Sequence, residues 1–323
     1  MPSRKRLLVS GHLGFIGSAF CHAFAGRFDI VGVDFGGWGS MAENLAPDVG
    51  HVDADIADDD RIAAVVDDAR PDAIVNFAAE SHVDRSLDDD SAFWRSNVFG
   101  ARNLARAAKR RGIRLVHVST DEVYGDAADA GQAWTEGTPI SPRNPYAVTK
   151  AAAEMMLLAY AETDGLDVVV TRGSNTIGPR QFPEKAVPKA VACFGSGQPF
   201  PLFRTPARRM WMHVDDHAAG ICAALDGGRA GEVYNLAPAA GNEAYTHDVI
   251  ERVRDLVGGG SIEAVDDRSG YDLRYWMKAD KAADELGWTA TRDLEQTLAE
   301  TVAWYTEHPD WLDAACRRLA AAA

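Results

Sequence analysis

Basic residues are scarce in this sequence. Its 323 residues include 33 lysines and arginines against 48 aspartates and glutamates, which gives a net charge of −15. Nucleic acids and anionic membranes are bound by clusters of positive charge, so this balance argues against both as partners. A small phosphorylated ligand is still compatible with it, because a few local cations and backbone amides suffice to bind a phosphate.

Long apolar runs and paired cysteines are also missing. The run at residues 7–9 is too short for the core of a secretion signal, and no stretch is long enough to cross a membrane. The four cysteines are Cys21, Cys193, Cys222 and Cys316. They are far apart, which favours neither a zinc site nor a disulfide framework. We therefore expect a cytoplasmic protein with free thiols and no metal.

The first half of the sequence alternates short β-branched runs with helical patterns. Strands are predicted at Arg6–Ser10, Asp29–Asp34, Asp72–Phe77, Leu115–Ser119 and Val168–Arg172. Helices are predicted at Ile16–Ala25, Asp59–Ala69 and Ala92–Arg110, and from Tyr146 onward. Strands separated by helices predict an α/β fold, a doubly wound parallel sheet of the Rossmann type with helices on both faces.

The pattern changes near Asn175, where proline and glycine become frequent. We divide the chain into a nucleotide-binding domain at 1–174 and a smaller α/β substrate-binding region at 175–323, some of whose segments return to the first domain. The predicted elements of the second region are a strand at Glu232–Ala237 and helices at Asp216–Leu225, Thr246–Val257 and Leu294–Tyr305. The alanine-rich end after Cys316 is expected to be a frayed helix end, and the ligand crevice to lie between the two parts.

A glycine-rich turn follows the first predicted strand. Residues 11–17 read G-H-L-G-F-I-G and open the first predicted helix. Glycines in such a turn let the backbone approach a pyrophosphate, whose charge is met by the helix N-terminus. The context predicts a dinucleotide site, although the same glycines could serve the turn alone. Its residues are Gly11, Gly14, Phe15, Ile16 and Gly17.

Asp34 ends the second predicted strand and indicates which dinucleotide binds. A carboxylate there accepts hydrogen bonds from the adenosine ribose and repels a 2′-phosphate, which favours NAD over NADP; a solvated acid is the alternative. Asp55 and Ile56 follow a third strand, counted between Asp29–Asp34 and Asp72–Phe77, and are assigned to the cofactor by position alone. Ala78 and Ala79 follow the fourth strand, where the backbone passes close to the cofactor.

Tyr146 and Lys150 stand four residues apart and project from one face of a predicted helix. An ammonium near a phenol lowers the pKa of the phenol, so Tyr146 is a candidate base that takes a proton from an alcohol as hydride leaves to NAD. Lys150 is also expected to bond the nicotinamide ribose. Many surface helices carry a tyrosine and a lysine four residues apart, so the spacing alone is a weak signal. It becomes a strong one here because the pair follows the fifth strand of a predicted nucleotide-binding fold.

Thr120, Asp121 and Glu122 follow the fifth predicted strand directly. Open parallel sheets bind ligands at the carboxyl ends of their strands. Two carboxyl groups there suit a reaction that needs a general acid and a general base, because burial and mutual repulsion keep one of them protonated. A plain polar loop is the competing interpretation.

Longer motifs give these residues a family context. They read FAAESHVDRS at residues 77–86, STDEVYG at 119–125, FPEK at 182–185, DRSGYDLRY at 267–275 and ELGW at 285–288, besides the stretch 141–150 around Tyr146. Together they resemble the extended short-chain dehydrogenase/reductases and, within them, the nucleotide-sugar 4,6-dehydratases such as the dTDP-glucose enzymes. The resemblance covers nearly the whole chain.

The resemblance implies a lyase with tightly bound NAD. Tyr146 would remove the C4 hydroxyl proton as hydride leaves C4, and Thr120 would polarise the C4 oxygen. Glu122 would take the C5 proton while Asp121 protonates the departing C6 hydroxyl, and hydride would return to C6 to leave a 4-keto-6-deoxy sugar. The resemblance also assigns residues to the nucleotide-sugar substrate: Ser81, His82, Thr120, Asn175, Glu184, Lys185, Arg209, Arg268 and Tyr271. Asn175 would contact the nicotinamide as well.

Departures from the family pattern cluster on the substrate side. His12 and Leu13 replace Gly-Ala in the glycine turn, Met210 stands where an aspartate is usual, and Tyr271 replaces a histidine. Residues 202–207 lack the lysine loop that the family places near the nucleobase. These changes leave the base of the nucleotide, and the sugar, open.

Other interpretations of the same residues differ in what they need. A 4-epimerase needs no acid–base pair after the fifth strand, and a 5,6-dehydratase keeps the pair but returns no hydride to C6. A non-catalytic dinucleotide-binding protein would not need Tyr146, Lys150 or the carboxyl groups. His213 and His217 are read as a loop and a helix start rather than a metal pair. A homodimer through the helices at Ala92–Arg110 and Ala151–Ala161 is expected.

Overall fold

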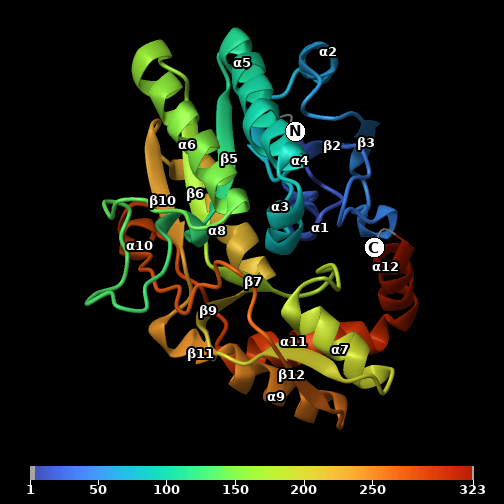
Figure 1. Cartoon of the computed structure of the whole chain (residues 1–323). Coiled ribbons are helices and arrows are strands. Elements are labelled where there is room, and N and C mark those ends of the chain that lie inside the picture. Colours follow the sequence, from blue (N-terminus) through green and yellow to red (C-terminus); the bar gives the residue numbers. More distant parts are fainter. Residues whose placement is uncertain (1–3, 322–323) are drawn as a thin grey trace.

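A seven-stranded parallel sheet forms the centre of the computed structural model, which describes residues 4–321. Its strand order is β10-β6-β5-β4-β1-β2-β3 (Figure 1). The strands are β1 (Arg6–Ser10), β2 (Asp29–Asp34), β3 (Gly50–Asp53), β4 (Ala73–Asn76), β5 (Arg114–Thr120), β6 (Val168–Gly173) and β10 (Glu232–Leu236). The predicted doubly wound α/β sheet is therefore confirmed.

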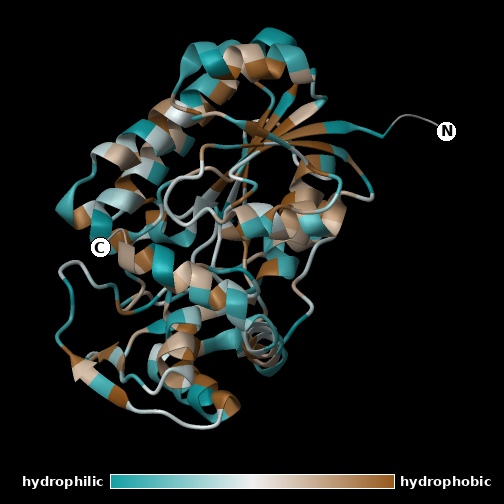
Figure 2. Ribbon diagram, turned by 90° about the vertical axis from the view of Figure 1, so that its right-hand side faces the viewer, coloured by the Kyte–Doolittle hydropathy of each residue, from teal (hydrophilic) through white to brown (hydrophobic). Residues whose placement is uncertain are grey.

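Helices cover both faces of this sheet because its strands are apolar on both sides. Leu7 and Val9 of β1 face one hydrophobic cluster, whereas Leu8 between them faces another. The first cluster is covered by α1 (Phe15–Phe24) and α8 (Val214–Gly227), and the second by α2 (Asp59–Ala69), α5 (Ala101–Arg111) and α6 (Pro145–Asp164). Figure 2 shows the hydrophobic strands between helices of mixed character.

Short helices enter the first domain beside α5 and α6. They are α3 (Val83–Asp88), α4 (Ser91–Phe93), the π-helical turn η2 (Trp94–Gly100) and the 3₁₀ turn η3 (Asp121–Tyr124). The helix predicted at Ala92–Arg110 is thus built from α4, η2 and α5. Wider helical turns of this kind are common near functional sites.

The second region packs two small sheets between helices below the large sheet (Figure 1). One sheet contains β7 (Asn175–Ile177), β9 (Arg208–His213) and β11 (Glu243–Tyr245), and the other contains β8 (Phe200–Phe203) and β12 (Ile262–Val265). Its helices are α7 (Ala186–Gly195), α9 (Thr246–Val257), α11 (Leu294–Glu307) and α12 (Pro309–Ala321), whereas α10 (Asp280–Leu286) packs on α8 and β10. The chain returns to the large sheet through β10, which pairs with β6.

The C-terminal helix α12 is regular to Ala321. The prediction of a frayed helix end after Cys316 is therefore wrong. In Figure 1 the end of α12 lies below the N-terminal strands β2 and β3. Its Trp311 donates a hydrogen bond from Nε1 to Asn44 Oδ1 (2.9 Å), and Arg318 donates to the carbonyls of Gly36 (2.6 Å) and Gly37 (2.8 Å). These contacts tie α12 to the loop after β2. In residues 4–321, no helix has the length and apolar character needed to cross a membrane.

Candidate active site

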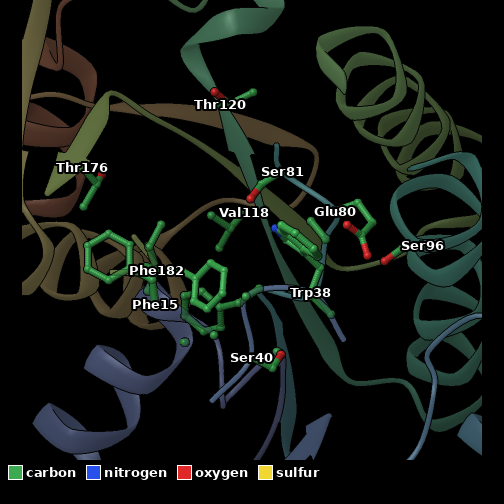
Figure 3. A pocket seen from close by; sticks show the side chains of 18 of the residues that line it. Phe15, Trp38, Ser40, Glu80, Ser81, Ser96, Val118, Thr120, Thr176 and Phe182 are labelled. Atoms are coloured by element: carbon green, nitrogen blue, oxygen red, sulfur yellow. The ribbon is translucent and has the colours of Figure 1, made fainter. Parts of the chain in front are cut away.

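A deep cleft opens at the carboxyl ends of the parallel strands, as the topology of such sheets predicts (Figure 3). It is lined by most of the residues that the sequence singled out: Gly11, Gly14, Phe15, Ile16, Gly17, Asp34, Ile56, Ala78, Ala79, Ser81, Thr120, Asp121, Glu122, Tyr146, Lys150, Asn175, Glu184 and Lys185. Side chains from the second region complete its walls. The fold therefore brings the predicted cofactor and chemistry residues into one cavity.

Two positions of the glycine turn leave no room for a side chain. Gly11 has φ +77°, and a Cβ on it would lie 2.6 Å from the Ala78 nitrogen. A Cβ on Gly17 would lie 2.2 Å from the Gly11 carbonyl oxygen. Gly14, the N-cap of α1, provides no side-chain cap, and Phe15, Ile16 and Gly17 of the first turn line the cleft. This is the cradle that a pyrophosphate requires.

Asp34 is buried at the end of β2 beside this turn. Its Oδ2 accepts a hydrogen bond from the Leu13 amide (3.2 Å), and Oδ1 accepts from the Gly36 amide and the Ser40 hydroxyl (both 2.9 Å). The carboxylate is thus fixed at the cleft wall, where a ribose would approach. Deeper in the cleft, Asn175 has a buried Oδ1 without a hydrogen-bond partner among the described residues. The glycine turn, the Asp34 carboxylate and the unpartnered Oδ1 of Asn175 together fit an NAD molecule.

Asp121 and Glu122 begin η3 directly after β5, and their surroundings differ. Asp121 is fully buried, and burial, followed by the charge of Glu122, raises its pKa to about 8. Its Oδ1 accepts a hydrogen bond from the Thr120 hydroxyl (3.3 Å), and its Oδ2 is buried without a partner. Asp121 is consequently protonated near neutral pH and is able to donate a proton.

Glu122 reaches into the cleft from the same turn. Its Oε2 accepts a hydrogen bond from Asn144 Nδ2 (3.0 Å) and faces the Tyr275 hydroxyl at 3.3 Å. Asn144 is also the N-cap of α6, where its Oδ1 accepts from the Ala147 amide (2.8 Å). One amide side chain therefore fixes both the start of α6 and the orientation of Glu122.

Tyr146 and Lys150 lie on the first turns of α6, both buried and both lining the cleft. Lys150 donates from Nζ to the Val118 carbonyl (2.6 Å), and burial lowers its pKa to about 8. The expectation that Lys150 lowers the pKa of Tyr146 is wrong for this arrangement. Burial, followed by the charges of Glu122 and Asp121, raises the pKa of Tyr146, although a hydrogen bond with Thr120 opposes the rise.

Ser81, Glu184, Lys185 and Trp38 also line the cleft. The Trp38 indole donates from Nε1 to Glu184, and the Arg85 guanidinium lies 4.2 Å from its ring centroid. Lys185 donates from Nζ to the Ser81 carbonyl (2.8 Å). Figure 3 shows the Trp38 indole among the side chains that line the cleft.

Five predicted residues do not line the cleft: Asp55, His82, Arg209, Arg268 and Tyr271. The carboxylate of Asp55 pairs with Arg95 at 2.7 Å. His82 caps α3 by accepting from the Arg85 amide (3.4 Å), and its Nε2 lies 3.7 Å from Glu184.

The two arginines lie near Tyr271 in the second region. Arg209 is buried and donates to the Asp272 carbonyl (2.6 Å), and its Cζ lies 5.6 Å from the Tyr271 ring centroid. Arg268 Cζ lies 5.9 Å from the same ring, and its buried Nη1 has no hydrogen-bond partner among residues 4–321. This guanidinium keeps a donor free for an anionic group.

His213 and His217 lie at the start of α8. His213 caps the helix by accepting from the Asp215 amide (3.1 Å), and His217 is hydrogen-bonded to the Thr176 hydroxyl through Nδ1 (2.9 Å). Within the described range 4–321, no group of three or more His, Cys, Asp and Glu side chains is arranged to hold a metal ion.

Sequence reasoning missed Trp38, Asn144 and Tyr275. Trp38 carries a usable signal, because it is an indole flanked by glycines in the loop that follows the Asp34 strand end. Asn144 precedes Pro145, a combination typical of a helix start. Nothing local in the sequence places Tyr275 beside Glu122, since 153 residues separate them.

Comparisons with known proteins agree with this geometry. Residues 7–237 match the model of the NAD dependent epimerase/dehydratase family. A dTDP-glucose 4,6-dehydratase of Actinoplanes sp. is 41% identical over 95% of this chain and 99% of its own length. The crystal structure of DesIV, a dTDP-glucose 4,6-dehydratase from Streptomyces venezuelae with NAD bound, superposes with a TM-score of 0.91 at 39% identity, covering 96% of this chain and 99% of that one. The enzyme of the same name from Bacillus anthracis, in complex with NAD, gives 0.88 at 36% identity over the same shares.

Proposed function

The chain belongs to the NAD-dependent epimerase/dehydratase family, and we propose that it converts a nucleotide-activated hexose to a 4-keto-6-deoxy sugar with loss of one water. The observation that carries this proposal is the side-by-side placement of two chemistries in one cleft. Tyr146 and Lys150 suit oxidation at C4. Asp121, whose pKa burial raises to about 8, and the neighbouring Glu122 suit elimination across C5 and C6.

The glycine turn, Asp34 and Asn175 would hold NAD. NAD, when bound, supplies the hydride acceptor for C4 and a positive charge beside the phenol. Asp34 would bond the adenosine ribose, with the amides at the start of α1 against the pyrophosphate. The unpartnered Oδ1 of Asn175 is suited to a donor from the nicotinamide amide or from the sugar.

Tyr146 would take the proton of the C4 hydroxyl. Burial raises its pKa, so the phenol keeps its proton until a positive charge arrives beside it. Thr120, on the side of the cleft next to Asp121, would hold the C4 oxygen, and Lys150 would bond the nicotinamide ribose. Ketone formation at C4 then makes the C5 hydrogen acidic.

Asp121 and Glu122 would complete the elimination. Glu122, oriented by Asn144, removes the C5 proton, and Asp121, protonated because it is buried, donates its proton to the departing C6 hydroxyl. The hydride removed from C4 would then return to C6 and a proton would be added to C5, so that the net change is the loss of one water per hexose. An epimerase would need neither group.

The substrate's diphosphate and base would lie toward Arg209, Arg268 and Tyr271. The free Nη1 of Arg268 supports a diphosphate contact, and Glu184 with Lys185 would face the sugar. The names of the relatives make dTDP-glucose the first donor to test. Tyr271 and the loop at 202–207 differ from the family pattern, so the donor panel must include other bases.

The test is mass spectrometry of the purified protein incubated with a panel of nucleotide hexoses. Loss of one water from one donor, without net NADH, is the expected result. Magnetic resonance of that product distinguishes a 4-keto-6-deoxy sugar from a 5,6-ene. A donor that keeps its mass but changes its C4 configuration would instead identify an epimerase and contradict the proposal.

We further propose that the protein is a cytoplasmic homodimer. Phe99 of η2 and Met155 of α6 are 48% and 60% exposed, and Trp94 and Val148 add to the same apolar face. Such a face on two adjacent helices suits pairing with a second copy. The four free cysteines suit a reducing compartment. Light scattering should give a dimer for the wild type and a monomer for Phe99→Asp combined with Met155→Asp.

A further inference from the structure

A chain of hydrogen-bonding side chains leads away from the back of Glu122. The Tyr275 hydroxyl lies 3.3 Å from Glu122 Oε2 and donates to Asp272 Oδ2 at 2.8 Å. Asp272 is completely buried, and its Oδ1 lies 3.2 Å from Arg143 Nη1. The Arg143 side chain is 48% exposed, so this chain of groups runs from the cleft to the protein surface.

From this arrangement we propose that Tyr275 and Asp272 form a proton relay that connects Glu122 with solvent during turnover. The inference rests on the proposed function, in which Glu122 takes the C5 proton. It assigns Tyr275 and Asp272 a role in the fate of that proton.

The direction of the hydrogen bonds supports the relay. The Tyr275 hydroxyl has one proton, and the shorter contact commits it to Asp272. While Glu122 is ionised, it accepts a hydrogen bond from Asn144. Once Glu122 has taken a proton, it becomes a donor and needs an acceptor, and the Tyr275 oxygen is beside it.

The transfer balances without any other reactant. Glu122 turns its carboxyl group about χ3, a soft torsion, and gives its proton to the Tyr275 oxygen as Tyr275 gives its own proton to Asp272. One proton has then moved from Glu122 to Asp272, and Tyr275 is neutral before and after. The reverse sequence returns a proton from solvent to Glu122, which adds it to C5 at the end of turnover.

The groups around Asp272 allow it to accept this proton. Burial raises its pKa, whereas Arg143 and the bond from Tyr275 oppose the rise. Asp126 accepts from the same Arg143 nitrogen at 3.1 Å, and Arg209 lies over the Tyr275 ring at 4.2 Å from its centroid. The raised pKa favours uptake of a proton by Asp272, and the ion pair with Arg143 favours its release. Arg143 is an exposed side chain that moves within nanoseconds, and each displacement admits water to Asp272.

The test follows the isotope at C5. Substrate deuterated at C5, dTDP-glucose first and otherwise the donor that loses water, is converted in ordinary water in a single turnover with enzyme in excess. The wild type should release a product whose C5 hydrogen comes from solvent. Tyr275→Phe and Asp272→Asn should return the original deuterium, so that the deuterated product changes from the minor to the major species. Rapid quenching keeps later exchange of the free ketone out of the measurement.

A matched control is available in Tyr234→Phe. Tyr234 is a fully buried tyrosine whose hydroxyl donates to Glu285 at 2.8 Å, far from the cleft, and its loss should leave the isotope pattern of the wild type. The pattern is a ratio within the product, so partial unfolding of a variant does not alter it. Complete loss of deuterium from both relay variants, or its retention by the wild type, would overturn the relay. If no donor loses water, the proposed function is refuted. That outcome is seen as an unchanged donor mass, whereas failure of the relay is seen in the deuterium content of the product, so the two are distinguishable.

Discussion

Replacing Asp121 by asparagine is expected to stabilise the fold while it removes the proposed acid. The carboxyl group has an ordinary pKa of 3.8 and a folded-state pKa of about 8, because burial and the charge of Glu122 disfavour its ionised form. The unfolded chain releases this proton above pH 3.8, and the folded chain holds it. The favourable contribution of this carboxyl group to the free energy of unfolding is therefore complete below pH 3.8, and it is lost as the pH rises toward 8.

The size of the effect follows from the difference between the two pKa values. Each pH unit between them lowers the free energy of unfolding by about 1.4 kcal/mol, so the advantage of Asp121→Asn over the wild type should widen by about 4 kcal/mol at most between pH 5 and pH 8. An asparagine has no proton to lose and keeps the shape of the protonated carboxyl group. Above pH 8 the difference should stop growing.

Urea unfolding of both proteins across this pH range measures the effect. Asp67→Asn, at a side chain that is 61% exposed, is the matched control and should show no such widening. An Asp121→Asn advantage that stays constant from pH 5 to pH 8 would refute the reasoning about burial. The same variant should produce no dehydrated sugar, and it should retain oxidation at C4, visible as NADH absorbance.

Three further predictions follow from the site. Glu122→Gln should retain NAD but lose dehydration by about a hundredfold or more, because the general base is gone; product analysis and bound-nucleotide content check both parts. Gly17→Ala should lose NAD on gel filtration, since its Cβ would lie 2.2 Å from the Gly11 carbonyl oxygen, whereas Gly26→Ala, where a Cβ meets nothing within 4 Å, should retain it. Arg318→Ala should speed NAD dissociation by about tenfold at most, because it frees the loop after Asp34 by removing hydrogen bonds worth about 1 kcal/mol; unchanged dissociation would show that α12 does not hold this loop.

The sequence predicts the sheet and the cleft because both depend on local patterns. Strands such as Arg6–Ser10 are continuous apolar runs, and the chemistry residues follow their carboxyl ends. Strand β3 gave no such pattern, because Gly50–Asp53 is a short edge strand with polar side chains. Asp55 follows it and would be taken for a cofactor residue on position alone, yet its carboxylate pairs with Arg95 outside the cleft.

The contacts that sequence reasoning could not supply are those between distant segments. The pKa of Tyr146 is one example, since a four-residue spacing predicts proximity to Lys150 but not the carbonyl of Val118 that binds its ammonium. Trp38 and Glu184 are another, because their hydrogen bond joins the cofactor loop to the second region across 146 residues. Such contacts depend on the packing of the whole chain.

The opposite roles of Asp121 and Glu122 have a simple origin in the backbone. A 3₁₀ turn has three residues per turn, so consecutive side chains point about 120° apart. In η3 both side chains line the cleft, but Asp121 is buried, loses water and keeps its proton, whereas Glu122 accepts a hydrogen bond from Asn144. The Thr120 hydroxyl accepts from the Glu122 amide (3.3 Å) and caps the turn, so the same residue that would hold the C4 oxygen also fixes the angle between acid and base. Adjacent carboxyl groups in an extended strand would instead point to opposite faces, and only one of them could reach a sugar.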